Sequence, residues 1–99
     1  MGIIIVTRRR IPKGKEKDVF GLIEKLRALA ETQAGYISDE TWKNYENQEE
    51  HMFIREWESL DNWHAWMSNK DRIEIQAKIE ERLNAKTDYS TYQIVQRSK

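Results

Sequence analysis

Two residues of the first predicted strand, residues 3–11, carry side chains that could act on a bound ligand. Successive side chains of a strand point to opposite faces, so Thr7 and Arg9 share one face. The Thr7 hydroxyl could hydrogen-bond a phenolic ligand, and Arg9 could hold an anion such as a phenolate or a carboxylate. The competing interpretation is that Thr7 simply favours a strand and that Arg9 lies at the solvated strand end. That interpretation is the simpler one for either residue taken alone.

Two tryptophans could form the wall of a pocket. Trp63 and Trp66 lie three residues apart on a predicted short helix, residues 60–67, and therefore share a side of it. Their flat rings could stack against an aromatic ligand. The alternative is that both residues pack in a small core, and Trp66 is the one that we carry forward as a site residue.

Gln76 is the most informative polar residue of the chain. It lies close to Ile79 and Leu83 on the apolar stripe of the last predicted helix. An amide on an apolar stripe needs a hydrogen-bond partner, which can be protein, water or ligand. The alternative is a position at the edge of the stripe, from which the amide reaches water.

Histidine and cysteine chemistry is restricted by composition. The chain has two histidines and no cysteine, which excludes disulfides, thiolate metal sites and a cysteine nucleophile. His64 lies beside the apolar stripe of its helix and could act as a general base or as a haem ligand, although such a histidine is more often a surface residue. The two histidines are far apart, without a carboxylate at helical spacing between them, so no metal site is expected.

The periodicity of apolar residues predicts seven elements in the order β-α-β-β-α-α-β. Ser59 is the expected cap of the short helix, and Ser68 to Asp71 resembles a capping box for the helix that follows. This order predicts an α+β, ferredoxin-like domain over residues 1–99, with a four-stranded antiparallel sheet and its second helix broken in two. The predicted elements are residues 3–11, 16–33, 36–45, 51–58, 60–67, about 70–83, and 89–97.

The first strand also predicts a homodimer. Ile3 to Val6 is apolar at every position, which is typical of a strand covered on both faces. The helices of one chain cover one face of the sheet. A second copy that lays its sheet against the first would cover the other face.

Charge and composition exclude several classes of partner. Seventeen basic residues balance seventeen acidic ones, so no overall field attracts nucleic acid or an anionic membrane. No segment approaches the about 20 apolar residues that span a bilayer, and the apolar start is too short for a signal peptide, so we expect a cytoplasmic protein. The four glycines are scattered and form no phosphate-binding loop, so bound flavin or nicotinamide is not expected.

The order and spacing of several short motifs resemble the antibiotic-biosynthesis-monooxygenase family over nearly the whole chain. The motifs are Ile3-Ile4-Ile5-Val6-Thr7, Ile11-Pro12-Lys13-Gly14-Lys15-Glu16, Gly35-Tyr36-Ile37, and Glu56-Trp57-Glu58-Ser59 before a short helix that ends near Trp66. The resemblance implies a dimeric α+β barrel in which each subunit has a pocket between its helices and its own sheet. It also implies that Thr7 and Arg9 face that pocket. Some members of the family are cofactor-independent monooxygenases of electron-rich phenols or quinols, and others degrade haem.

Residues 57–69 look most similar to the haem-degrading branch. That branch has an Asn on the first strand, a Trp that ends the short helix, and an iron-ligating His ten residues after that Trp. Here the corresponding residues are Thr7, Trp66 and Gln76. A neutral amide oxygen binds iron far more weakly than an imidazole nitrogen does.

Three hypotheses follow from the sequence and its resemblance. The first is a cofactor-independent monooxygenase of a small aromatic or quinol substrate, in which Arg9, Thr7 or Gln76 stabilises negative charge and Trp66 shapes the pocket. The second is a haem-binding or haem-degrading protein that uses His64 or no protein ligand. The third is a non-catalytic homodimer that binds a small hydrophobic molecule or serves as a stress-accessory protein.

Overall fold

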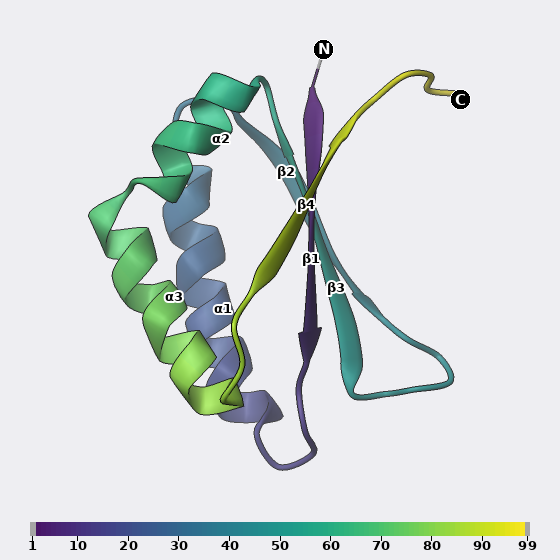
Figure 1. Cartoon of the computed structure of the whole chain (residues 1–99), viewed down its shortest axis with the longest axis vertical. Helices are drawn as coiled ribbons and strands as arrows, with labels where there is room; N and C mark the ends of the chain where they lie inside the picture. Colours follow the sequence, from purple (N-terminus) through teal and green to yellow (C-terminus); the bar gives the residue numbers. More distant parts are fainter. Residues whose placement is uncertain (1, 99) are drawn as a thin grey trace.

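A computed structural model describes residues 2–98 and confirms the predicted order of elements. Figure 1 shows a layer of helices against one face of a twisted sheet. Each boundary lies within a few residues of its prediction. The elements are β1 (Ile3–Arg10), α1 (Glu16–Glu31), β2 (Tyr36–Lys43), β3 (Glu50–Trp57), α2 (Leu60–Met67), α3 (Lys70–Leu83) and β4 (Asp88–Gln93).

The four strands form one antiparallel sheet in the order β2-β3-β1-β4. All three helices lie on the same side of it, with α1 and α3 next to each other (Figure 1). The sheet therefore has an inner face toward the helices and an outer face without a helix from residues 2–98. Within those residues, no helix is both long enough and apolar enough to cross a membrane.

The core lies between the helices and the inner face. One stripe of α1 is buried there, and the side chains of Trp57 on β3 and Ile79 on α3 are completely inaccessible. Ile3 and Ile5 of β1 belong to the same cluster, whereas Ile4 and Val6 are only partly buried. The alternation predicted for β1 is thus present, and the apolar residues on its outer side remain accessible.

The junction between α2 and α3 differs from the prediction in one detail. Ser59 caps α2 as predicted, because its hydroxyl accepts from the Asn62 amide at 3.1 Å. The predicted capping box with Ser68 as its first residue is wrong. Asn69 caps α3 by accepting from the Arg72 amide at 2.9 Å, while Ser68 still closes the last turn of α2.

The last strand is shorter than predicted. Residues 89–97 were expected to form it, but β4 ends at Gln93, the residue that pairs with Ile3. Ile3 is the first residue of β1, so the residues after Gln93 have no strand beside them to continue the ladder. Regular pairing ends where the partner strand ends.

Gly35, in the turn between α1 and β2, allows Asn62 of α2 to lie close to the backbone. Its φ is +86°, a conformation that side chains other than glycine rarely adopt. A Cβ atom at this position would lie 2.3 Å from Cγ of Asn62. The glycine therefore sets the approach of α2, the helix that carries both candidate tryptophans.

Candidate functional site

A cavity of about 90 Å³ lies between the helix layer and the inner face of the sheet. The sheet contributes Thr7 and Arg9, and α2 contributes Trp63 and Trp66. Further aromatic side chains complete the wall, and these are Phe20, Phe53, Trp57 and Tyr89. The site is therefore a small aromatic chamber with a few polar groups.

Thr7 and Arg9 both lie on the inner face, and each is only 7% exposed. In the sheet, Thr7 stands between Phe53 of β3 and Tyr89 of β4, which are its paired residues on the two neighbouring strands. The interpretation of Arg9 as a solvated residue at the strand end is wrong. The guanidinium is buried between Gln76 of α3, to which it donates, and the ring of Phe53 on β3.

Arg9 is held at the cavity by few partners. Its Nη2 donates to Oε1 of Gln76 at 3.0 Å, and its guanidinium carbon lies 4.8 Å from the centre of the Phe53 ring. Its Nε is buried and has no hydrogen-bond partner among residues 2–98. Burial lowers the pKa of Arg9 to about 10, so the group still carries its charge at pH 7.

Gln76 does not line the cavity but holds Arg9 from behind. Besides accepting from Arg9, it donates through Nε2 to Oγ1 of Thr87 and to Oε2 of Glu80. Oε2 of Glu80 also accepts from the Thr87 amide at 3.0 Å. Burial alone would raise the pKa of Glu80, but these hydrogen bonds outweigh it and lower the pKa. The hydrogen-bond partners expected for the Gln76 amide are therefore protein side chains.

Both tryptophans of α2 line the cavity. The Trp66 ring lies 5.7 Å from the Trp57 ring, and the Trp63 ring meets Tyr89 edge to face at 6.4 Å. Trp66 is only 4% exposed, so it belongs to the core and to the cavity wall at once. The indole Nε1 of Trp57 is a second buried donor without a partner in the described chain.

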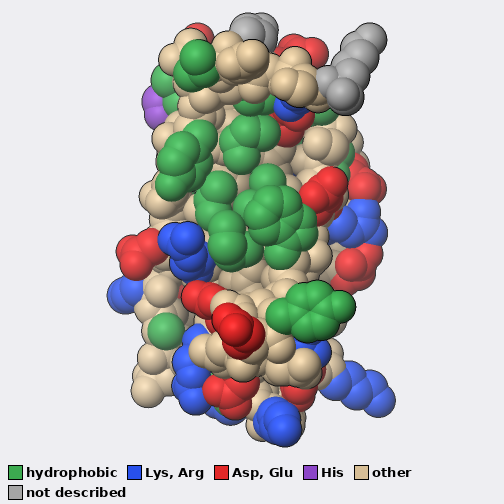
Figure 2. All heavy atoms as spheres, turned by 90° about the vertical axis from the view of Figure 1, so that its right-hand side faces the viewer, with side chains coloured by type: hydrophobic (Ala, Val, Ile, Leu, Met, Phe, Trp, Pro, Cys, Tyr) green, Lys and Arg blue, Asp and Glu red, His purple; other side chains and the backbone are tan. Residues whose placement is uncertain are grey.

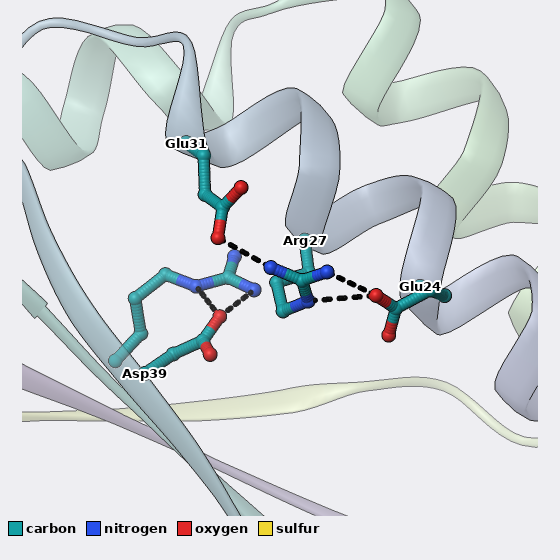
Figure 3. Close-up of polar contacts among 5 residues, drawn as sticks. Glu24, Arg27, Glu31 and Asp39 are labelled. Carbon is teal, nitrogen blue, oxygen red and sulfur yellow. Dashed lines mark hydrogen bonds and ion pairs between the residues drawn. The ribbon is translucent and has the colours of Figure 1, made fainter.

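The rim of the cavity carries ion pairs. Arg27 of α1 pairs with both Glu24 and Glu31 of its own helix, and Arg55 pairs with Asp39 at 3.1 Å. Figure 3 shows the Arg27 cluster and Asp39 facing one another across the space between α1 and the sheet. Glu24, Glu31 and Asp39 thus already have cationic partners, whereas Glu40, which also lines the cavity, accepts from the indole Nε1 of Trp42 at 2.8 Å.

Arg72 and Tyr89 line the cavity but are not among the site residues predicted from the sequence. Nη2 of Arg72 donates to the Tyr89 hydroxyl at 2.5 Å, and its Nη1 donates to the Met67 carbonyl at 3.1 Å. Arg72 is 6% exposed and lines the cavity. Its position four residues before Gln76 on α3 was a usable signal, because that spacing places the two on one helix face.

The histidines lie outside the cavity wall. His64 is exposed on α2 with its ring against Trp63, whereas His51 is 4% exposed with Nδ1 3.1 Å from the Glu49 carbonyl oxygen. Gln76 already uses its amide on Arg9 and Thr87. The residues present therefore do not fit axial ligation of haem iron in this cavity. Residues 2–98 also contain no cluster of three or more His, Asp or Glu side chains arranged to hold a metal ion.

Comparison with known proteins gives one family and one fold. The family model described as antibiotic biosynthesis monooxygenase matches residues 2–78. No protein with a curated description matches the chain.

Three solved structures illustrate the likeness of fold. A conserved protein from Methanosarcina mazei Go1 is 19% identical, with a TM-score of 0.85 over 94% of this chain and 92% of that one. SnoaB, a cofactor-independent oxygenase from Streptomyces nogalater, is 12% identical, with a TM-score of 0.84 over 97% and 95%. A structure from Bordetella bronchiseptica, described as a putative antibiotic biosynthesis monooxygenase, is 18% identical, with a TM-score of 0.81 over 96% and 98%.

Proposed function

This chain belongs to the antibiotic biosynthesis monooxygenase family, and on that premise we propose that it oxidises a small phenol or quinol with dioxygen and without a cofactor. One observation carries the proposal. Arg9 is a buried cation beside an aromatic cavity, and its Nε lacks a partner within residues 2–98. Such a group favours the anionic form of a phenol, which is the form that reacts with dioxygen.

The size of the cavity supports a small substrate. Its volume is about 90 Å³. An engineered cavity of about 150 Å³ in another protein admits benzene. This cavity is smaller than that one, so a substrate ring would fill it only after side chains of the wall shift, and the ring substituents would extend to the polar groups or the rim.

The reaction balances without a further redox partner. A phenolate transfers an electron to dioxygen, and the resulting pair combines to form a carbon–oxygen bond at an unsubstituted ring position. The peroxide then takes a proton, its O–O bond breaks, and the hydrogen of that ring carbon leaves as a proton. The products are a quinone, which keeps one oxygen atom, and water, which contains the other. All electrons come from the substrate.

The residues have distinct roles in this proposal. Arg9 binds the phenolate oxygen and stabilises the charge that develops on the dioxygen adduct. The Thr7 hydroxyl, on the same face, donates to the same region, and Trp66 presses the ring into place. Gln76 is a positioning residue, because it reaches the substrate only through Arg9.

Oxygen uptake by the purified protein tests the proposal, with a panel of phenols and quinols and with no metal, flavin or haem added. Arg9→Gln should lower kcat/KM by about 100-fold, the scale of losing one preorganised charge-stabilising donor. Arg10→Gln is the matched control, because Arg10 is exposed and pairs with Glu49 at the surface. Absence of uptake with every substrate, or equal activity of both variants, would refute the proposal.

We also propose that the protein is a homodimer that buries the outer face of the sheet. Figure 2 shows apolar side chains gathered at the centre of that face. This outer patch is made of Ile4, Val6, Trp42, Met52, Ile54 and Tyr92, as the strand register and alternation indicate. Exposed apolar surface of this kind favours association with a second copy.

A further inference from the structure

The four arginines that line the cavity fall into two classes. Arg27 and Arg55 are each paired with carboxylates at the rim. Arg9 and Arg72 form no ion pair with any residue between 2 and 98, although both line the same cavity. No carboxylate contacts either of these two positive charges, because Gln76 separates Arg9 from Glu80 and the carboxylate of Glu40, which also lines the cavity, accepts from Trp42.

Both of these charges are deeply buried. Arg9 and Arg72 are 7% and 6% exposed, and removal of a charge from water is costly unless an opposite charge compensates it. The partners of Arg9 and Arg72 are neutral, namely the Gln76 amide, the Met67 carbonyl and the Tyr89 hydroxyl. The Nε of Arg9 is a buried donor without a partner in residues 2–98, so it is available to an acceptor atom of a ligand.

The two arginines also lie at different places on the wall. Arg9 projects from β1 over Phe53, whereas Arg72 projects from α3 onto Tyr89 of β4. Two separate cations along one aromatic chamber can bind two anionic groups carried by one flat molecule.

We infer that the substrate carries a carboxylate in addition to its phenol, so that the ligand class of this site is a hydroxylated aromatic acid. The inference rests on the proposed function for the phenolate, which Arg9 holds. Arg72 holds the carboxylate, through donors that remain after its bonds to Met67 and Tyr89. The ring lies between the two arginines, against Trp63 and Trp66. A substrate with two negative charges then neutralises both buried cations.

A matched pair of ligands tests the inference on the unmodified protein. 4-Hydroxybenzoate and 4-hydroxybenzamide have almost the same shape, but only the first carries a carboxylate. Calorimetric titration at pH 7 should give about tenfold or more tighter binding of the acid, the scale of a charge-assisted hydrogen bond in a buried site. The preference should remain in high salt, because buried pairs are poorly screened. Equal binding, or a preference that salt abolishes, would overturn the inference.

Two variants locate the carboxylate. Arg72→Gln should bring the two affinities to within about twofold, whereas Arg72→Lys should retain part of the preference because it keeps the charge. Arg10→Gln is again the surface control and should bind like the wild type. Should Arg72→Gln fail to fold, the shift of the Arg72 Nε–H resonance on titration of the wild type replaces it. Retention of the full preference in Arg72→Gln, or a resonance that the acid does not move, would contradict the assignment.

The outcome is separable from that of the proposed function. Oxygen uptake with phenols that lack a carboxylate depends on Arg9 and on the cavity alone. If those phenols are oxidised as fast as the hydroxylated acids, the proposed function stands and the carboxylate inference fails. If the acid binds with the expected preference but no phenol is oxidised, the inference stands and the monooxygenase proposal fails.

Discussion

The inner and outer faces of the sheet differ in the side chains that β1 gives them. On β1, the inner side chains pass from Ile5 to Thr7 and Arg9, which are all buried. The outer side chains are Ile4 and Val6, which are half-buried, followed by the exposed Arg8. The polar chemistry thus lies inside, under the helices, and apolar surface lies outside. A buried polar residue and an exposed apolar residue are both informative. The first calls for a hydrogen-bonding partner, here a ligand, and the second for a covering surface, here a second copy of the chain.

Alanine substitution at the two neighbouring isoleucines is the strongest test of this contrast. Ile5→Ala should lower the free energy of unfolding by about 2–5 kcal/mol, because it opens a hole in the packed core. Ile4→Ala should cost about 1 kcal/mol in dilute solution, since this side chain loses less burial. Urea titrations monitored by tryptophan fluorescence provide both values. Equal losses at the two positions would remove the distinction between the faces.

A charge on the outer patch tests its role in assembly. Val6→Asp should weaken self-association by about 100-fold, because a carboxylate would be buried without a partner. Sedimentation equilibrium at several protein concentrations measures this change. Gly21→Asp on α1 is the control, because it adds the same charge where no atom lies within 4 Å of the new Cβ. A wild-type protein that stays folded and monomeric at micromolar concentration would refute the dimer.

Moving a carboxylate on the inner face tests how much stability the protein loses because Arg9 contacts no acid. The double variant Gln76→Glu with Glu80→Gln keeps the net charge but moves the carboxylate into contact with Arg9. The ligand-free protein should gain about 1 kcal/mol of stability, because Arg9 acquires a charged acceptor. Oxygen uptake should fall at the same time, since the internal carboxylate competes with the phenolate. Glu80→Gln alone should lose rather than gain stability and should keep its oxygen uptake, and a double variant that keeps full activity would argue against Arg9 as the anion site.

The smallest expected effect is the response of the inner face to acid. The lowered pKa of Glu80 means that its bonds to Thr87 and Gln76 stabilise the fold above pH about 4.5, and that this contribution disappears as pH falls through the lowered value. Because Glu80 is partly exposed, the contribution is less than about 1 kcal/mol. Thermal unfolding of the wild type and of Glu80→Gln at pH 7 and pH 3 measures the difference. A wild-type melting temperature that falls no further than that of the variant would contradict this role.

Local periodicity was sufficient to predict the architecture and half of the site. The alternation of β1 put Thr7 and Arg9 on one face, and helical spacing put Trp63 and Trp66 on one side of α2. Both pairs line the same cavity. These features depend on backbone geometry that each short segment adopts with its own residues, so the chain order alone makes them visible.

The remaining part of the site depends on distances between elements that are remote in the sequence. Arg9 and Gln76 are 67 residues apart, and Arg72 meets Tyr89 across the end of α3. No local sequence pattern indicates which arginines form ion pairs with carboxylates in the folded chain and which do not. The sequence by itself determined which residues share a face. Only tertiary packing decided that Arg9 and Arg72 would be buried together without an acid, because burial and charge balance depend on every neighbour at once.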